Sequence, residues 1–564
     1  MSLNIIGIAF TADATAALVS DGVLVAAIGE ERLNREKLWK GVPRKAIDKV
    51  LEIGGLKLSE IDFFAVHGAP TSPDKTAFEA AFQRIREADI SEALREHQLQ
   101  QIQQRLDHET FVCEERTPAI IRELESLGRP VITFPHHEAH AASAYYASGW
   151  DDCITVTADG WGEDASGTIW SCSNGKMEHI STTPTIDSLG YFYGAITKSL
   201  GFIPHRHEGK VLGLAAYCSD PKSYGEIGNM VSADVEGAKF VGHAENGLFA
   251  PTYDSPPLVD FIQNYSREDV SAAAQKRLEE VVCELISSLS NTPKRFALAG
   301  GIFANVKLNQ RITELDNVSD VYVFPCMGDG GLAVGTAWLA YVEKTGKNPV
   351  PPKSMLLGMT IEDDEVVAAL EKSGLPYERP ENLAHSVADL LADGSVVVRC
   401  NGAMEYGPRS LGNRSILYKA NDPSANEWLN DRLKRSEFMP FAPATLIEDA
   451  PELYHNLDKA RVPANYMTMT FDCTEKMCQD APAAVHIDKT ARPQLVSKEL
   501  YPEFHEILEH YKSLTGFSSV VNTSFNMHEE PIVGDASDAI RAFVASGLPY
   551  MALGDYLVRQ PDGV

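Results

Sequence analysis

The sequence predicts an α/β fold with more than one domain, and three features of the chain support this prediction. Short apolar runs, as at residues 5–10, 154–157 and 296–299, alternate with segments of helical periodicity. The 564 residues exceed what one hydrophobic core usually organises, so we expect two or three domains. Residues 346–353 contain three prolines, which end helices and stiffen the chain. We therefore expect a boundary near residue 350, between domains over residues 1–350 and 354–564.

The expected elements follow in chain order. Residues 5–10, 16–19 and 23–28 predict a pair of β-hairpins. Residues 74–115 combine helical spacing with many charges and glutamines, which predicts solvated helices without chemistry. Further strands are expected at residues 131–134, 154–157, 296–299 and 395–399, with helical periodicity from about residue 139 and again over residues 366–391.

The composition argues against several classes of protein. Hydrophobic residues make up 44% and charged residues 23%, which is typical of a globular chain. The net charge of −29 disfavours a nucleic-acid surface, and no apolar run reaches the roughly 18 residues of a membrane span. The N-terminus lacks signal-peptide features, and the nine cysteines form no Cys-x-x-Cys pair. We therefore expect a cytoplasmic protein without nucleic-acid or membrane partners.

A histidine pair is the first candidate site. His136 and His140 are four residues apart, so a helix would place both on one face, where they could hold one metal ion. The alternative is a pair of surface or hydrogen-bonded core histidines, and the spacing does not choose among zinc, iron, copper and nickel. Asp159 follows the strand at residues 154–157, at the end where carboxylate ligands and phosphate-binding turns are common.

Glycine-rich turns suggest a bound phosphate. Residues 209–215, 300–305 and 328–331 each place glycine where backbone N–H groups could approach an anion. Singly, each is explained more simply as a tight turn. Together with Asp159 and Asp329 they indicate a nucleotide and a metal held between two lobes of one α/β domain.

A polar loop in the second half predicts an oxyanion site. Residues 401–417 contain Arg409 and Arg414 among serines and asparagines in a segment broken by glycine and proline, and arginine binds phosphate bidentately. Residues 434–443 add two cations, and residues 520–526 end a strand in amide and hydroxyl groups. The alternative is a surface loop paired with acidic neighbours.

These segments resemble the NodU-type carbamoyltransferases, which include the tobramycin and cephamycin carbamoyltransferases. The match runs in family order over nearly the whole chain, and its most specific part is residues 405–416. The other matching segments are residues 30–32, His136 with His140, and residues 157–160, 188–190, 209–216, 299–305, 328–331 and 522–526.

The resemblance implies an N-terminal ASKHA-type domain with actin-like, RNase H-like lobes and a C-terminal YrdC-like α/β domain. In such families carbamoyl phosphate is hydrolysed to carbamate, which attacks ATP to give carbamoyl-adenylate and pyrophosphate. The carbamoyl group then passes to an acceptor in the first domain, and AMP is released. The implied acceptor is a hydroxyl (or amine) of a small molecule, such as a sugar-like compound or secondary metabolite made in natural-product or antibiotic biosynthesis.

The resemblance also assigns roles to individual residues. His136, His140 and Asp329 would bind a divalent metal, usually iron in this family, with Asp159 as a ligand or its neighbour. Mg²⁺ would accompany ATP. The implied nucleotide-binding residues are Lys210, Gly213, Gly300, Gly301, Asn305 and Gly330. The implied carbamoyl phosphate-binding residues are Arg409, Ser410, Asn413, Arg414, Lys434, Arg435, Asn522 and Asn526.

One departure from the family pattern affects catalysis. Many relatives carry a histidine immediately before the aspartate of the first hairpin, where this chain has Ala12 before Asp13. If that histidine is the acceptor base, the candidates here are Asp13, then His137 or a metal-bound hydroxide. The predicted catalytic residues are therefore Asp13, His137 and Asp159. An amine acceptor, a degenerate transferase or an engineered alanine would equally account for Ala12.

The competing functions are a small-molecule kinase of the ASKHA fold and a non-catalytic ATP-binding regulatory protein. The histidine pair disfavours the kinase, and the regulatory protein leaves Arg409 and Arg414 without a role. A symmetric homodimer is the default expectation for the assembly. The sequence leaves open the acceptor, the choice between O- and N-carbamoylation, and the identity of the metal.

Overall fold

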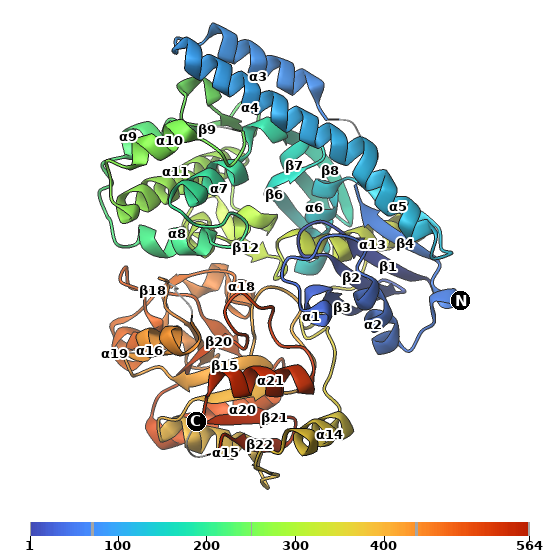
Figure 1. Ribbon diagram of the computed structural model, residues 1–564, viewed down its shortest axis with the longest axis vertical. Helices are drawn as coiled ribbons and strands as arrows, with labels where there is room; N and C mark the ends of the chain where they lie inside the picture. The colour runs from blue at the N-terminus through green and yellow to red at the C-terminus, as the bar shows by residue number, and fades with distance from the viewer. Residues whose placement is uncertain (1, 69–72, 250, 435–437, 562–564) are drawn as a thin grey trace. The chain divides into compact units, whose positions relative to one another are not determined.

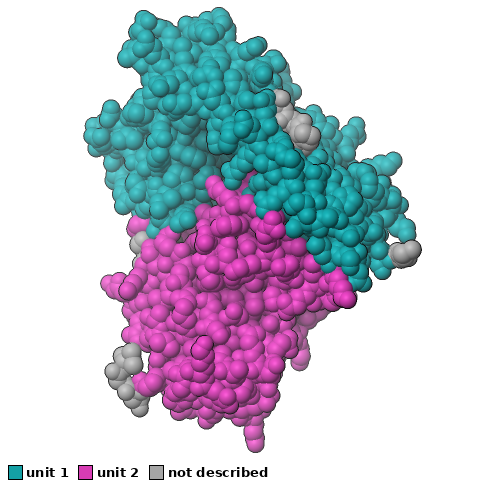
Figure 2. Space-filling view, turned by 45° about the vertical axis from the view of Figure 1, so that its right-hand side comes forward, with its two compact units in different colours: residues 1–10, 18–24, 58–351 teal, residues 11–17, 25–57, 352–564 magenta. Residues whose placement is uncertain are grey.

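The computed structural model describes residues 2–68, 73–249, 251–434 and 438–561 (Figure 1). The chain divides into two compact units, coloured in Figure 2. Unit 1 comprises residues 1–10, 18–24 and 58–351, and unit 2 comprises residues 11–17, 25–57 and 352–564. The second unit thus includes two pieces of the N-terminal segment as well as the C-terminal part of the chain. Within the described residues, no helix has the length and apolar character needed to cross a membrane.

Two five-stranded sheets with the same strand plan build the first part of the fold. In each, three consecutive strands form a meander, and its first strand pairs in parallel with a later strand, which in turn pairs in parallel with a further one. The first sheet has the order β3-β2-β1-β4-β5, from β1 (Asn4–Ala9), β2 (Thr15–Ser20), β3 (Val23–Gly29), β4 (Phe63–His67) and β5 (Val131–Phe134). The second has the order β12-β11-β6-β7-β8, from β6 (Asp152–Gly162), β7 (Ala165–Ser173), β8 (Lys176–Pro184), β11 (Lys294–Ala299) and β12 (Val318–Val323). The α/β class is confirmed, and the repeated plan fits the two lobes expected of an ASKHA-type domain.

Two helices form the layer between these sheets in unit 1. Helix α13 (Leu332–Thr345) packs on β1 and β4, helix α6 (His136–Ser148) packs on β6 and β11, and the two helices contact each other. Glycine makes this close packing possible, because a Cβ on Gly335 would lie 1.9 Å from the carbonyl oxygen of Ala139. The first turns of both helices are thereby held beside the end of β6.

The helices at residues 74–115 are present, but one of them carries buried charge. Helix α4 (Glu92–Phe111) packs beside α3 (Lys75–Glu87) and contains Arg105 and Glu109, whose side chains are 2% and 0% exposed and form an ion pair. The Arg105 guanidinium also lies 3.7 Å from the ring centre of Tyr191. The expectation of purely solvated helices was therefore wrong, because an i, i+4 charge pair can neutralise itself and turn inward.

An eight-stranded mixed sheet forms the core of unit 2. Its order is β13-β22-β21-β14-β15-β20-β16-β19. The strands are β13 (Tyr377–Glu378), β14 (Val397–Cys400), β15 (Arg414–Lys419), β16 (Ala442–Leu446), β19 (Gln494–Val496), β20 (Ser519–Ser524), β21 (Tyr550–Leu553) and β22 (Tyr556–Arg559). Helices α15 (Leu383–Ala392), α20 (Pro502–Thr515) and α21 (Ala536–Ser546) pack against it. The likeness of this unit to YrdC remains a prediction.

The helical periodicity over residues 366–391 belongs to two helices. Helix α14 (Asp363–Ser373) ends at Gly374, whose φ of 68° is left-handed, and α15 begins after Pro376 and the short strand β13. Glycine after a helix and proline shortly beyond it are the usual stop signals. The periodicity continues across the break, so the pattern alone does not separate the two helices.

Candidate functional site

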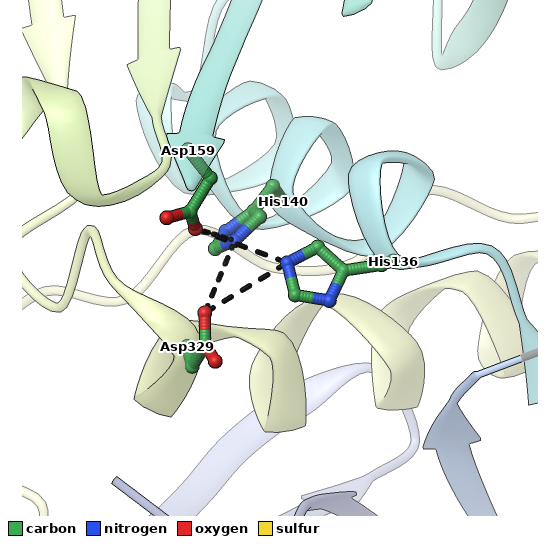
Figure 3. A group of neighbouring side chains, drawn as sticks. All are labelled: His136, His140, Asp159 and Asp329. Atoms are coloured by element: carbon green, nitrogen blue, oxygen red, sulfur yellow. Dashed lines mark hydrogen bonds and ion pairs between the residues drawn. The ribbon is translucent and has the colours of Figure 1, made fainter. Parts of the chain in front are cut away.

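Two histidines and two aspartates meet in unit 1 (Figure 3). His136 and His140 come from α6, Asp159 from β6, and Asp329 from the turn that leads into α13. Asp159 Oδ2 lies 3.8 Å from His136 Nε2 and 3.1 Å from His140 Nε2, and Asp329 Oδ1 lies 3.7 Å and 3.9 Å from the same two nitrogens. The four ligand atoms lie within 4.8 Å of one another.

Local chain features bring these side chains together. Pro135 separates β5 from α6, so the helix begins at His136 and its first turn presents both imidazoles on one face. Asp159 Oδ1 accepts the N–H of Gly160 at 2.6 Å, which turns the carboxylate at the end of β6. Ser188 donates from its hydroxyl to the carbonyl oxygen of Gly160 at 2.7 Å and holds this stretch of backbone. The ligand geometry therefore rests on hydrogen bonds and strand ends.

The charges of the cluster favour a cation. Burial alone would raise the pKa of Asp159, but the neighbouring imidazoles of His136 and His140 hold it well below its usual range. Burial alone would lower the pKa of His136, but Asp159, Asp329 and Glu163 raise it to about 9. Burial and the neighbouring His136 lower the pKa of His140. The site thus has two acidic ligands, one readily neutral imidazole and one imidazole that holds a proton.

An orphaned nitrogen supports the fit of a metal. His136 Nε2 is buried, and among the described residues it has no hydrogen-bond partner. A metal ion would satisfy this nitrogen and compensate both carboxylates at once. Two imidazoles with two carboxylates suit zinc, iron or manganese, so the donor set fits a divalent metal without selecting one.

His137 points elsewhere. Its Nδ1 lies 2.8 Å from Thr157 Oγ1 and its Nε2 lies 3.2 Å from the carbonyl oxygen of Ala165. The carbonyl can only accept, so Nε2 carries the proton and Nδ1 accepts from the threonine hydroxyl. Both nitrogens of His137 join α6 to β6 and β7, which is a structural use of the ring.

Three of the predicted nucleotide-binding residues lie next to the metal ligands or their neighbours. Gly300 has a φ of 101°, and a Cβ there would lie 2.2 Å from the carbonyl oxygen of Ala158. A Cβ on Gly301 would lie 3.0 Å from Asp159 Oδ1. Gly330 follows Asp329 in the turn before α13. These glycines let the backbone approach the cluster closely.

The other nucleotide candidates lie in helices or cap them. Residues 208–215 form helix α8 (Glu208–Ala215), so Lys210 and Gly213 are helical and do not belong to a turn at a strand end as expected. Asn305 caps helix α12 (Val306–Thr313) by accepting the N–H of Leu308 at 3.0 Å, and its amide donates to Gln275 at 2.7 Å. The spacing of Gly209 and Gly213 is compatible with both a turn and a helix, so the sequence alone did not distinguish the two.

The polar loop of unit 2 surrounds a carboxylate of its own. Glu405 is buried, and its Oε1 accepts the N–H groups of Leu411, Asn413 and Arg414 at 2.8, 2.7 and 3.1 Å. Successive N–H groups that converge in this way form a concavity for an anion. The sequence predicted an oxyanion held by arginine side chains, whereas the anion that these backbone N–H groups bind is the glutamate side chain.

Arg414 is used to hold the backbone of unit 2. Its side chain is fully buried, and its guanidinium donates to five carbonyl oxygens, those of Met359, Asn401, Gly402, Asn413 and Gly534, at 2.8–3.4 Å. A guanidinium has five N–H donors, so this arrangement occupies the group. The predicted role of Arg414 in binding phosphate directly therefore does not fit its contacts.

Four other predicted carbamoyl phosphate residues also bond within unit 2. Ser410 donates to the carbonyl oxygen of Arg414, and Asn413 donates to that of Ala403. Asn526 donates to the carbonyl oxygens of Met527 and Glu530. Asn522 donates to Ser410 and Gln494, while its Oδ1 is buried without a hydrogen-bond partner among the described residues. Asn522 thus keeps one acceptor available.

The remaining predicted cations are more accessible. Arg409 is half-buried on the loop and Lys434 is exposed, with a left-handed φ of 55°. Arg435 lies outside the described residues. Arg409, Lys434 and Asn522 therefore stay candidates for the predicted phosphate contacts.

Sequence reasoning missed two arginines of unit 2. Arg399, at 4% exposure, donates to Asn413 Oδ1 at 2.6 Å and to Glu503 at 2.7 Å. Arg32 donates to the carbonyl oxygen of Gly407 at 3.1 Å, and its Nη1 is buried without a hydrogen-bond partner in the described part of the chain. Arg32 lies in the segment 30–32 that matched the family. The sequence therefore marked this segment, but it did not predict that Arg32 contacts the polar loop.

Asp13 lies in the turn between β1 and β2. Its backbone is left-handed, with a φ of 66°, and its carbonyl oxygen accepts from the hydroxyl of Thr15 at 2.8 Å. Aspartate tolerates this conformation better than most residues. The turn is therefore compatible with Asp13, and Ala12 precedes it as the sequence indicated.

Comparison with known proteins gives matches over most of the chain. Residues 4–338 match the family model of the carbamoyltransferase N-terminus and residues 388–560 that of the carbamoyltransferase C-terminus. Nodulation protein NolNO of Sinorhizobium fredii is 30% identical, over 98% of this chain and 79% of its own length. Nodulation protein NolO of Bradyrhizobium diazoefficiens is 32% identical, over 75% of this chain and 78% of its own length.

Nodulation protein U of Rhizobium tropici is 26% identical, over 95% of this chain and 93% of its own length. Among solved structures, HypF of T. kodakarensis matches 61% of this chain and 49% of its own at 14% identity, with a TM-score of only 0.34. The two family models together with the relatives of 30% identity or more show that the chain belongs to the carbamoyltransferase family and is an enzyme of that class.

Proposed function

We propose that the protein transfers a carbamoyl group from carbamoyl phosphate to a hydroxyl of a small molecule, using ATP and a divalent metal. The observation that carries the proposal is the His136, His140, Asp159 and Asp329 cluster, with its buried and unpartnered His136 Nε2. Two partly buried carboxylates that face two buried imidazoles favour a bound cation, because enclosing like charges without one is costly. Membership of the carbamoyltransferase family identifies the carbamoyl group as the group that is transferred.

The proposed reaction has three balanced steps. Water converts carbamoyl phosphate to carbamate and phosphate. A carbamate oxygen attacks the α-phosphorus of ATP, which gives carbamoyl-adenylate and releases pyrophosphate. The acceptor oxygen then attacks the carbamoyl carbon, loses its proton to a base, and displaces AMP. The acceptor is a sugar-like or other hydroxylated small molecule, with an amine as the variant.

The residues of the cluster divide the work of the last step. When bound, the metal supplies a Lewis acid that draws charge from the carbamoyl carbonyl. Asp159 stays ionised, because its pKa lies well below its usual range, so it acts as a ligand and not as a proton carrier. His137 is occupied by Thr157 and Ala165, so Asp13, which is not part of this cluster, stays our candidate for the acceptor base on the sequence pattern alone. Iron is the metal that the family resemblance favours.

Nucleotide and phosphate contacts complete the proposal. Gly300, Gly301 and Gly330 are the backbone positions near the cluster that we assign to a nucleotide phosphate. In unit 2, we assign the phosphate of carbamoyl phosphate to three cations, Arg32, Arg409 and Lys434. Asn522 Oδ1 would accept a hydrogen bond from the amide of the carbamoyl group. Arg414 and Glu405 hold the loop in shape for these contacts.

Pyrophosphate release tests the proposal most directly. The purified protein with ATP and no acceptor should release pyrophosphate only when carbamoyl phosphate is added, because carbamate is the nucleophile of the adenylating step. Release of pyrophosphate without carbamoyl phosphate would contradict the proposed donor. Formation of ADP on adding sugars would instead indicate a kinase.

Metal binding should displace a proton. The pKa of His136 is raised to about 9, so at pH 7 the metal-free site holds a proton that a cation must replace. We expect about one proton released per ion at pH 7, and an affinity that rises about tenfold per pH unit between pH 6 and 8. Calorimetric titration in buffers of different ionisation enthalpy measures the proton count. A pH-independent affinity with no proton release would contradict a cation bound at His136.

A further inference from the structure

A second group of potential ligands adjoins the metal cluster in unit 1. A ring nitrogen of His67, a ring nitrogen of His136 and a carboxylate oxygen of Glu163 lie within 4.8 Å of one another. His67 ends β4, and Glu163 follows β6. Neither residue was singled out from the sequence, and neither has a role in the reaction described above.

The hydrogen bonds of His67 exclude it as a ligand for a second metal. The N–H of Phe10 donates to His67 Nε2 at 3.3 Å, and the Phe10 ring stacks on the imidazole at a centroid distance of 4.2 Å. A nitrogen that accepts a hydrogen bond carries no proton, so the proton of the neutral ring is on Nδ1. His67 can therefore only donate from Nδ1.

Glu163 is the acceptor that remains in this group. It is 9% exposed, and its Oε2 accepts the backbone N–H of His136 at 2.9 Å. Its own backbone is left-handed, with a φ of 56°, and the Trp161 indole donates to its carbonyl oxygen at 2.9 Å. A non-glycine residue adopts this conformation at a cost, so the surrounding contacts hold Glu163 in place.

The His136 ring is enclosed by the same segment. A Cβ on Gly162 would lie 2.5 Å from two carbons of the imidazole, so only glycine lets β6 pass against the ring. His136 Nε2 faces Asp159 and Asp329, which leaves Nδ1 as the nitrogen for an outer contact. A histidine that binds metal through one nitrogen usually donates from the other to a carboxylate, which sets the tautomer and the ring orientation.

We propose that Glu163 is the positioning residue of the metal centre. Its carboxylate accepts a hydrogen bond from the Nδ1–H of His136 and so holds Nε2 toward the ion. The inference rests on the metal centre of the proposed function. One carboxylate then serves three donors, the backbone N–H and Nδ1–H of His136 and the Nδ1–H of His67. Its two oxygens have about four acceptor positions, which is sufficient.

The test uses Co²⁺ as the probe, with the full-length protein freed of metal by a chelator. Glu163→Gln keeps the volume and an oxygen for the helix N–H but removes the charge that orients His136. We expect its Co²⁺ affinity to fall about 10- to 100-fold, with an altered visible absorption spectrum of the bound ion. Competition with a chromophoric chelator measures the affinity.

Asp164→Asn is the matched control, because it removes a neighbouring negative charge from an exposed side chain. It should leave affinity and spectrum unchanged. Glu163→Asp keeps the charge but withdraws the oxygen, so its affinity should fall between those of the wild type and Glu163→Gln; this variant decides the question if Glu163→Gln does not fold.

Equal affinity and equal spectra for the wild type and the Glu163 variants would overturn the positioning role and leave the metal centre intact. Failure of the wild-type protein itself to bind Co²⁺ would overturn the metal centre, and with it the proposed function. The two failures are therefore distinguishable in one experiment.

Discussion

Replacing His140 with alanine should abolish tight metal binding and stop carbamoyl transfer, while carbamoyl phosphate-dependent pyrophosphate release continues. His140 Nε2 lies 3.1 Å from Asp159 and 3.9 Å from Asp329, so its loss removes one of four converging ligands. Loss of a partner outside the ligand set already costs 10- to 100-fold in affinity, so losing a ligand should cost more than about 100-fold. Transfer should slow by about 1,000-fold or more, since metal activation contributes several kcal/mol at 1.36 kcal/mol per tenfold.

Metal content by elemental analysis and acceptor carbamoylation by mass spectrometry measure these two effects. His137→Ala is the matched control, because His137 lies on the same helix and bonds to Thr157 and Ala165. It should lower stability yet keep the metal. Normal acceptor turnover by metal-free His140→Ala would remove the metal from the transfer step.

Replacing Arg414 with methionine should destabilise the protein severely. In the wild type, the fully buried Arg414 guanidinium donates hydrogen bonds to five carbonyl oxygens. The substitution removes the guanidinium and leaves these oxygens without that donor. Breaking a buried charged network by removing one partner costs about 3–5 kcal/mol in the free energy of unfolding. We expect the unfolding transition of unit 2 to fall by about 10 °C, using 2–4 °C per kcal/mol for a unit of this size.

Arg409→Met provides the comparison from the same loop. Arg409 is half-buried, so its replacement should leave the melting temperature nearly unchanged. If it binds carbamoyl phosphate as proposed, the KM for that substrate should rise by about 30-fold or more, because a charged partner of a buried phosphate contributes about 2 kcal/mol or more. Differential scanning calorimetry and the pyrophosphate assay separate the two effects. A stable Arg414→Met protein with a raised KM would restore Arg414 to the substrate site.

The metal ligands show how far local pattern reaches. The i, i+4 spacing of His136 and His140 determines that both face one way on a helix, and Pro135 determines where that helix begins. Asp159 and Asp329 follow strand and loop signals that are also local. Their meeting depended on the repeated sheet plan, but each ligand was identifiable from its own segment.

The polar loop of unit 2 shows where local pattern fails. Its composition predicted arginines around an oxyanion, but it did not show that the backbone N–H groups of the loop would bind the Glu405 carboxylate. The direction of Arg414 was equally hidden, since two of its acceptors, Met359 and Gly534, are 55 and 120 residues away. A binding arginine and a structural arginine have the same sequence signature.

The sequence by itself determined the α/β class and, through its resemblance to a known family, the family and the four metal-ligand candidates, because periodicity and short motifs are properties of neighbouring residues. Only the tertiary structure decided which polar side chains face a site and which hold the backbone. It buried the ion pair of Arg105 and Glu109 and joined His137 to Thr157 by a hydrogen bond. It also placed the Glu163 carboxylate where it accepts the backbone N–H of His136. The physical reason is that a buried polar group must find a partner, and that partner is supplied by chain segments far away in sequence.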